Sequence, residues 1–249
     1  MKHERLTGYA FALFTIIVWG STFISSKILL TTYTPAQIML TRFLLAYAAL
    51  WLLRPRRMAL SWRQELSFIV LGLTGCSVYF YTENSALTYT LASNVSIIVA
   101  AAPIFTSGGI LVVCNGSFVL KLNPQGDLLA LAAAGCWAVY SVLLRHVSQG
   151  LDPVLVTRRT MFWGILTALP IVILEGAPYP LSPLFTPVVA GNLLFLGLIG
   201  SALCFVLWNK AFRLLGVVTT NNFIYLNPFV TVVAARLVLR EPISPLAAT

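Results

Sequence analysis

Long, nearly uncharged apolar stretches constrain this chain more than any other feature. Hydrophobic residues make up 59% of its 249 residues and charged residues 9%, whereas about a quarter of a typical soluble domain is charged. A helix crosses the hydrocarbon core of a bilayer with about 20 apolar residues, and hydrocarbon forces each backbone group to be hydrogen bonded within the chain. The stretches are too long and too uniform for β-barrel strands. The sequence therefore predicts an all-α polytopic membrane protein.

Short turns and basic loops separate the predicted spans. The first span begins near Gly8 and is too long for the apolar core of a signal peptide. The net charge is +9, but the basic residues form no stripe of the kind that binds a row of phosphates, so no nucleic acid partner is expected. The predicted spans cover residues 8–30, 35–53, 66–87, 92 onward, 127–144, 154–174, 188–207 and 217–239.

The sequence contains an internal repeat. Leu-Gly-Leu-Thr-Gly at 71–75 recurs as Leu-Gly-Leu-Ile-Gly at 196–200, and the residues that follow keep the same spacing in both copies. Two copies with the same helix order are typical of secondary transporters, whose substrate site lies at the repeat interface. We therefore predict two transmembrane repeats, residues 1–120 and 121–249. The aligned pairs are Phe80 and Phe205, Asn84 and Asn209, Ala86 and Ala211, Pro103 and Pro228, and, at a slightly different spacing, Trp19 and Trp137, Lys27 and Arg145, and Pro35 and Pro153.

Basic residues predict the orientation of the repeats. Lys2, Arg5 and the arginines at 54–63 place the N-terminus and the loop after the second span on the cytoplasmic side. The basic residues of the second half lie on that side only if the second half is inverted relative to the first. Inversion needs an odd number of crossings before Asp127. We count four, because the apolar stretch 95–120 is long enough for one span and not for two. Charge and length therefore disagree, and either a fifth crossing is missing or a short re-entrant segment replaces it.

A series of short motifs follows the order seen in one family of transporters. The motifs are Trp19-Gly20-Ser21-Thr22-Phe23, Arg42-Phe43, Glu83–Leu87 followed by Ala92–Asn94, and the matching proline motifs Ala102–Thr106 and Leu226–Phe229. In this order, and with the internal repeat, they resemble the drug/metabolite transporter superfamily, of the EamA-like type. The resemblance covers nearly the whole chain.

The resemblance implies a fold and a function. Members of this family have ten helices in two inverted five-helix repeats, and this chain is expected to lack most of helix 5 and all of helix 10. The expected function is a secondary transporter that exports amino acids, related compounds or drugs by alternating access, either proton-coupled or facilitative. Its partners would be a small-molecule substrate and the lipid bilayer of the cell inner membrane, and the protein would be a monomer or homodimer. The alternative that stays open is a truncated remnant that does not transport.

Polar side chains in hydrocarbon are costly, so those inside the predicted spans are candidate site residues. Glu83, near the end of the third span, could carry a coupling proton. It could equally lie at the interface, or pair with Arg42 or Lys27. Arg42, well inside the second span, could bind a substrate carboxylate through its planar fork. Its alternatives are a structural ion pair or snorkelling toward the loop.

Aromatic, amide and hydroxyl side chains complete the predicted substrate site. The aromatic residues could line a pocket for an apolar or aromatic group, or serve as packing and interfacial belt residues. The amides could bond substrate or bridge helices. Proline interrupts the helical ladder, which suits a hinge. The candidates are Trp19, Tyr79, Trp137, Tyr140 and Tyr225; Asn84, Asn94, Asn209, Asn221, Asn222 and Asn227; Ser21 and Thr22, which also suit local capping and close packing; and Pro103 and Pro228 as hinges.

Enzyme and metal chemistry are not expected. A membrane-embedded hydrolase needs a nucleophile with a base inside the bilayer, but His3 and His146 lie in the N-terminal tail and at a helix end. The cysteines are isolated, without Cys-x-x-Cys or Cys/His spacing, so neither a zinc site nor an obligatory disulfide is predicted. No cofactor is expected. A membrane-embedded enzyme is therefore a weaker alternative than a transporter.

Overall fold

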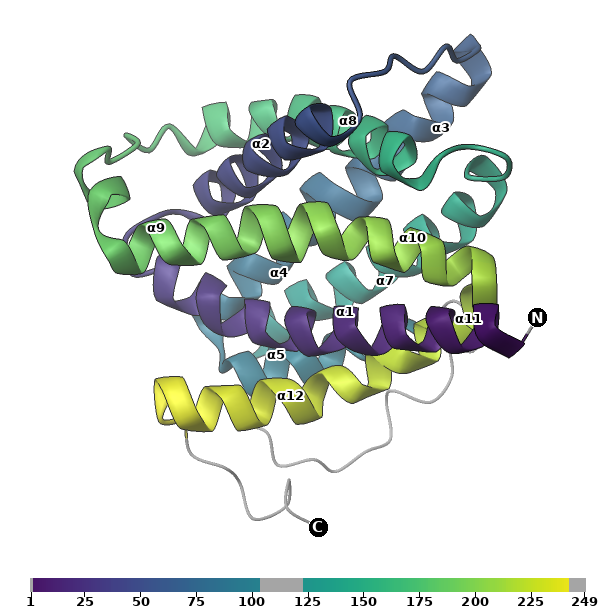
Figure 1. Ribbon diagram of the computed structural model, residues 1–249. Coiled ribbons are helices and arrows are strands. Elements are labelled where there is room, and N and C mark those ends of the chain that lie inside the picture. Colours follow the sequence, from purple (N-terminus) through teal and green to yellow (C-terminus); the bar gives the residue numbers. More distant parts are fainter. Residues whose placement is uncertain (1, 104–122, 242–249) are drawn as a thin grey trace.

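Helices account for the regular structure of the computed structural model, which describes residues 2–103 and 123–241 (Figure 1). Within these residues, seven helical stretches are long and apolar enough to cross a membrane. They cover His3–Leu29, Pro35–Leu53, Trp62–Tyr89, Pro124–Val147, Pro153–Glu175, Pro187–Leu215 and Val217–Leu239. The predicted all-α, membrane-spanning class is confirmed. The stretches Trp62–Tyr89 and Pro187–Leu215 are longer than the predicted spans 66–87 and 188–207.

Several spans consist of two or more helical segments in sequence. The first half contains α1 (Lys2–Leu29), α2 (Pro35–Leu53), α3 (Trp62–Gly72), the π-helical segment η1 (Leu73–Ser77), α4 (Val78–Tyr89) and α5 (Ala92–Val99). The second half contains α7 (Pro124–Val147), α8 (Pro153–Glu175), the 3₁₀ turn η2 (Ser182–Phe185), α9 (Pro187–Leu194), the π-helical η3 (Phe195–Leu203), α10 (Cys204–Leu215), α11 (Val217–Asn221), the 3₁₀ segment η4 (Asn222–Leu226), α12 (Asn227–Ala234) and the π-helical η5 (Ala235–Leu239).

The prediction about the fifth and tenth helices falls mainly on residues 104–122 and 242–249, which lie outside the described residues. The limits of the two halves, 1–120 and 121–249, stay a prediction for the same reason.

Local sequence signals explain where the helices begin. Thr34 caps α2, where its hydroxyl accepts from the Gln37 backbone N–H and the Gln37 side chain accepts from the Thr34 N–H. Asp152 accepts from the first backbone N–H groups of α8. Proline, which lacks the N–H that would be left unpaired there, occupies the first turn of α2, α7, α8 and α9.

The two halves run in opposite directions across the bundle, as the basic residues predicted. In Figure 1, α3 and α4 run from right to left, whereas their counterparts α9 and α10 run from left to right. The halves also pack on each other in matching pairs. The helix α1 packs on α10, and its counterpart α7 packs on α4. This arrangement confirms the inverted repeat.

The Leu-Gly-Leu-x-Gly repeat marks the closest approach between the halves. A side chain at Gly75, in the π-helical segment of the first half, would lie 2.2 Å from the Tyr140 ring. At the equivalent Gly200, it would lie 2.9 Å from the Thr22 methyl group. Tyr140 and Thr22 are themselves repeat-related positions on α7 and α1. Glycine is therefore required twice, because each third span presses against the first span of the other half.

The first glycine of each motif makes a second matching contact. A side chain at Gly72 would lie 2.6 Å from Trp163 on α8, and one at Gly197 would lie 2.6 Å from Leu45 on α2. Trp163 and Leu45 are again repeat-related. Each third span therefore packs against the first and second spans of the opposite half, and this four-glycine contact forms part of the repeat interface, together with α2 on α8 and α1 on α12.

Replacing Gly75 by alanine should destabilise the protein by about 1–3 kcal/mol, because the fully buried Tyr140 ring has no room to move away. Gly135→Ala is the matched control, since a side chain there meets no atom within 4 Å and alanine is the better helix former. Thermal unfolding of the two purified variants in detergent would measure the difference. Equal midpoints for Gly75→Ala and Gly135→Ala would contradict this account of the interface.

Candidate substrate cavity at the repeat interface

A small cavity lies at the centre of the bundle, between helices of both halves. The open space at its centre has a volume of about 20 Å³, close to what one water molecule needs. A substrate can enter only if the lining side chains move apart. The lining residues are Trp19, Thr22 and Phe23 of α1, Tyr79, Phe80 and Glu83 of α4, Val99 of α5, Trp137 of α7, Ile224 of η4 and Asn227 of α12.

Repeat-related aromatic rings meet each other at this cavity. Trp19 and Trp137 pack edge to face with their ring centroids 5.1 Å apart. Phe80 and Phe205 lie 6.2 Å apart. Residues that are equivalent in two repeats can touch only near the axis that relates the repeats. The cavity therefore lies on the pseudo-two-fold axis, where a transporter of this architecture holds its substrate.

The two central tryptophans differ in their hydrogen bonds. The indole N–H of Trp19 donates to the Gly200 carbonyl at 2.9 Å. The indole N–H of Trp137 is buried and has no partner among the described residues. The side-chain oxygen of Asn227 is also buried and has no partner within residues 2–103 and 123–241. Because unpaired buried polar atoms are costly, this donor and this acceptor are available to a ligand in the cavity.

Glu83 is the acidic residue of the cavity wall. Its side chain is 3% exposed, and it is hydrogen bonded to Tyr79, one helical turn earlier on α4. It also interacts electrostatically with Arg42 of α2. The structure therefore places a buried carboxyl group beside the aromatic rings.

Arg42 lies behind the cavity wall. Its side chain is fully buried, and its guanidinium carbon lies 4.1 Å above the ring of Phe80. Nε donates to the Ser201 hydroxyl of the opposite half at 2.9 Å, but Nη1 and Nη2 have no hydrogen-bond partner among the described residues. Two unpaired donors on a buried cation are expensive, which makes this group a strong candidate for ligand binding.

Some predicted site residues lie elsewhere and bridge helices. Asn84 donates to the Pro35 carbonyl at 3.4 Å, and its repeat partner Asn209 donates to the Thr157 hydroxyl at 2.8 Å. Each amide thus joins the third span to the start of the second span in its own half. Asn94 donates to the Thr90 hydroxyl. For Asn84 and Asn209 the structure favours the helix-bridging interpretation, whereas the Asn94 bond is local, to a residue four positions earlier.

Other candidates lie at the edge of the cavity or on the surface. Tyr140 is fully buried and packs against Trp137 at 5.0 Å, but it does not line the open space. Ser21 donates to the Ile17 carbonyl of its own helix. Asn222 is exposed and Tyr225 is 44% exposed. The role of these four residues in substrate binding stays a prediction.

The sequence analysis found part of the cavity wall. Among the residues that it named, Trp19, Thr22, Tyr79, Glu83, Trp137 and Asn227 are brought together here. It did not propose Phe23, Phe80, Val99 or Ile224, which are apolar and carry no signal that separates them from ordinary packing. Phe80 had one usable signal, because it has a repeat partner that is also phenylalanine.

The helical ladder breaks just before each predicted hinge proline. The helix α5 ends at Val99 and two turn residues precede Ala102 and Pro103. In the second half, the 3₁₀ segment η4 separates α11 from α12, which begins at Asn227 and Pro228. Val99, the last residue of α5, and its repeat equivalent Ile224, in η4, both line the cavity. The breaks are therefore structural, and their use as hinges stays a prediction.

Metal binding receives no support from the residues that are described. They contain no group of three or more His, Cys, Asp or Glu side chains that could hold a metal ion. The cysteines among them, Cys76, Cys136 and Cys204, are free.

Comparison with known proteins identifies relatives of this chain. The model of the EamA-like transporter family matches residues 6–118 and again 124–248. An uncharacterized transporter of Archaeoglobus fulgidus is 27% identical over 91% of this chain and 87% of its own length. A probable terminal-alkyne amino-acid exporter of Streptantibioticus cattleyicolor is 28% identical over 94% of this chain and 86% of its own length. A crystal structure with 18% sequence identity superposes with a TM-score of 0.71 over 98% of this chain and 93% of the other.

The unequal hydrogen bonds of the central tryptophans lead to a test of the cavity geometry. Trp19→Phe should lower the stability by about 0.5–1.5 kcal/mol more than Trp137→Phe, because only Trp19 loses a hydrogen bond. The two substitutions remove the same atoms from repeat-related positions, so each is the control for the other. Thermal unfolding in detergent would measure both, and a larger loss for Trp137→Phe would refute the assignment.

Proposed function

The chain belongs to the EamA-like transporter family, and we propose that it exports small metabolites across the cell inner membrane by alternating access. It is a multi-pass membrane transporter and not an enzyme, and it works on a small-molecule substrate within a lipid bilayer. The proposal is based on the cavity on the axis between the inverted halves. It is also based on the difference between the two ends of the bundle, one of which is open and the other closed.

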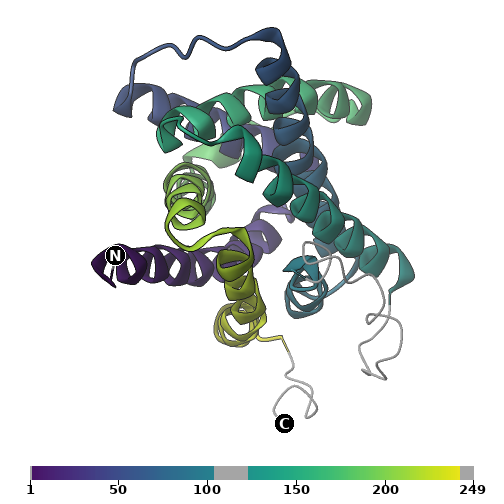
Figure 2. The same cartoon turned by 90° about the vertical axis from the view of Figure 1, so that its right-hand side faces the viewer.

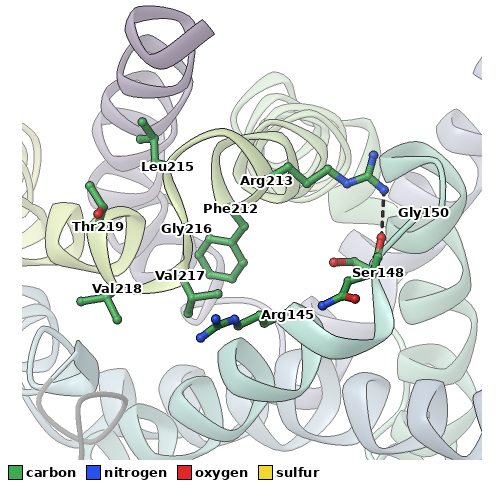
Figure 3. A pocket seen from close by; sticks show the side chains of 11 residues that line it. Arg145, Ser148, Gly150, Phe212, Arg213, Leu215, Gly216, Val217, Val218 and Thr219 are labelled. Atoms are coloured by element: carbon green, nitrogen blue, oxygen red, sulfur yellow. Dashed lines mark hydrogen bonds between the residues drawn. The ribbon is translucent and has the colours of Figure 1, made fainter. Parts of the chain in front are cut away.

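One end of the bundle holds an open pocket. This end is where α1 begins, and by the distribution of basic residues it faces the cytoplasm; Figure 2 views the molecule from this end. The pocket has a volume of about 560 Å³ and lies between the end of α7, the end of α10 and the start of α11. Figure 3 shows Arg145, Phe212 and Val217 around it. It is large enough for a metabolite.

The equivalent place at the other end is closed. There the ammonium group of Lys27, the repeat partner of Arg145, donates to the Leu87 and Thr90 carbonyls at 2.6 Å each. Glu241 closes the same place, because its carboxylate accepts from the Ala92 backbone N–H at 3.0 Å. Equivalent positions in the two halves thus have different environments. This difference supports a conformation that is open toward the cytoplasm and sealed toward the outside.

Aromatic side chains separate the cytoplasmic pocket from the central cavity. Phe212, which lines the pocket, packs on Trp208 at 5.6 Å, and Trp208 packs on Trp19 of the cavity at 4.9 Å. A substrate that enters from the cytoplasm must displace these rings. The breaks before Pro103 and Pro228 are the proposed hinges for the movement that exchanges the open and closed ends.

The proposed substrates are amino acids or related compounds. The aromatic wall suits an apolar group, and one relative is named a probable terminal-alkyne amino-acid exporter. We propose Glu83 as the residue that carries a coupling proton, because it is a buried carboxyl group on the cavity wall. A monomer contains the whole cavity, and a homodimer of such units would work in the same way.

Transport by the purified protein is the direct test. In proteoliposomes, the protein should exchange at least one member of a panel of amino acids, nucleosides and cationic drugs, and a proton gradient should drive its net movement. Glu83→Gln should abolish the response to the proton gradient, because the amide cannot carry the proton. A correctly folded protein that moves none of the panel would support the alternative of a non-transporting remnant.

The external seal can be tested separately. Lys27→Met removes two hydrogen bonds that join α1 to the end of α4. The end of the bundle that faces the outside should therefore open more often. In a background without native cysteines, a cysteine at Phe23 should then react about tenfold faster with an impermeant thiol reagent added outside intact cells. Arg145→Met is the matched control and should leave that rate unchanged. An equal rate in Lys27→Met and the parent would exclude Lys27 as part of the seal.

A further inference from the structure

A further pocket lies between the two halves, away from the central cavity. It forms where the end of α2 and the loop after it meet the start of α8, and its volume is about 180 Å³. The helix α2 belongs to the first half and α8 to the second, and the two pack on each other along the top of Figure 1. Three arginines and three aromatic rings line the pocket: Arg57, Arg158, Arg159, Tyr47, Trp51 and Phe162. No acidic residue of the described part of the chain lines it.

Arg158 is the buried cation of this pocket. Its side chain is 6% exposed, and its guanidinium carbon lies 4.2 Å from the centre of the Trp51 ring. Nη1 and Nη2 donate to the backbone carbonyls of Arg54 and Arg56 in the loop after α2. Carbonyl groups are neutral, and no carboxylate of the described residues forms an ion pair with Arg158. Its positive charge is therefore buried without an opposite charge, which is costly.

The two other arginines differ in their partners. Arg159 is neutralised by Glu65 of α3, which accepts from its Nε at 3.0 Å and from its Nη2. Arg57 is exposed, and its side chain has no hydrogen bond or ion pair with the described residues. The pocket thus contains two uncompensated positive charges, one from the loop of the first half and one from a helix of the second half.

The contact with the loop does not explain why residue 158 is charged. At the other end of the bundle, a neutral side chain near the start of α2 makes the corresponding contact. Gln37 donates to the carbonyls of Ala177 and Pro178, in the loop after α8, at 3.2 and 3.1 Å. Since an amide is sufficient to hold a loop in this way, the positive charge of Arg158 calls for another explanation. Membrane orientation does not provide it, because the rule on basic residues concerns the loops.

The depth of the pocket indicates which molecules can reach it. The 23 residues of α8 extend over about 34 Å, slightly more than the hydrocarbon core of a bilayer, which is about 30 Å thick. The first turns of α8 therefore lie near the lipid headgroups. Arg158 comes five residues after Pro153, about 8 Å along the helix axis. Trp51 and Tyr47, close to the end of α2, are of the types that gather at the membrane–water interface.

We propose that this pocket binds the phosphate group of an anionic phospholipid from the cytoplasmic leaflet, between Arg57 and Arg158. A guanidinium group has five N–H donors, of which Arg158 uses two, and its planar shape suits phosphate oxygens. The rings of Trp51 and Phe162 offer an apolar surface to the glycerol and the beginning of the acyl chains. Basic pockets between transmembrane helices on the cytoplasmic side are suited to lipid headgroups.

A lipid bound in this way joins the two halves at their cytoplasmic end. Its phosphate contacts the loop after α2 on one side and α8 on the other. Because a ligand that binds only the folded protein stabilises it, the lipid should raise the stability of the whole bundle. This inference does not depend on which substrate the protein transports.

Lipid binding to the purified protein in detergent is the test. The probes are phosphatidylglycerol, phosphatidylcholine, which has the same phosphate together with a cation, and glycerol 3-phosphate, which has no acyl chains. Native mass spectrometry should show one retained phosphatidylglycerol, with about tenfold higher affinity than phosphatidylcholine. The thermal unfolding midpoint should rise with phosphatidylglycerol alone, and glycerol 3-phosphate at the same concentration should not displace it.

Two neighbouring arginines provide a matched pair of variants. Arg57→Gln should weaken phosphatidylglycerol binding about tenfold and leave the lipid-free unfolding midpoint unchanged, because Arg57 has no partner in the described protein. Arg56→Gln removes the same charge from the adjacent loop position, but that side chain does not line the pocket and its carbonyl remains. It should bind phosphatidylglycerol as the parent does.

Variants of Arg158 separate its charge from its contact with the loop. Both Arg158→Gln and Arg158→Lys change the carbonyl bonds, and the lipid-free midpoint measures that loss for each. The rise in midpoint on adding phosphatidylglycerol measures the site itself. This rise should disappear in Arg158→Gln and be partly retained in Arg158→Lys, which keeps the charge but not the planar group.

Three results would contradict the proposal. Equal affinity for phosphatidylglycerol and phosphatidylcholine would exclude a site for anionic lipid. Equal weakening in Arg56→Gln and Arg57→Gln would mean that the basic loop attracts anionic lipid diffusely, without a pocket. Displacement of phosphatidylglycerol by an equal concentration of glycerol 3-phosphate would overturn the lipid assignment and indicate a site for soluble phosphate compounds.

Discussion

The close approach of glycine backbones to side chains of the opposite half is the contact on which the rest of this structure depends. Gly75 lies against Tyr140, and Gly200 lies against Thr22. Association between helices in a membrane relies on close packing, because lipid supplies no hydrophobic driving force. Both glycines lie in π-helical turns of the third spans. The axis between the repeats, and the cavity on it, follow from this contact.

The inverted packing brings equivalent residues together and also makes their environments unequal. Trp19 and Trp137 touch, but only Trp19 is hydrogen bonded to the opposite half. Glu83 faces the cavity, whereas its repeat partner is Trp208. Symmetry thus gives the two halves equivalent positions, and the differences between the halves place one acidic residue, Glu83, on the cavity wall.

Several site residues could be predicted from the sequence because polar atoms inside apolar runs stand out. Glu83 and Arg42 were found in this way, and the repeat drew attention to Trp19 and Trp137. The same reasoning also selected Asn84 and Asn209, which bridge helices within their own halves. A buried amide looks the same in a sequence whether it faces a cavity or a neighbouring helix. Phe80 shows the opposite problem, because nothing in a sequence distinguishes an apolar residue on a cavity wall from an apolar residue in ordinary packing.

By itself, the sequence determined that the chain spans a membrane as helices and that its two halves are related. The basic residues indicated an inverted second half, but the count of four crossings disagreed, and the structure decided in favour of inversion. The properties visible in the sequence depend on composition, on spacing and on the placement of basic residues. Each of these can be seen along the chain without knowing which helices contact each other. Only the tertiary structure decided which side chains share the cavity, that Arg42 stacks on the Phe80 ring of the cavity wall, and that one end is closed by Lys27 and Glu241 while the other is open. Those features depend on the rotation and depth at which distant helices meet. A rotation of one residue along a helix turns a side chain by about 100°, away from the cavity, and no pattern in a single sequence records that angle.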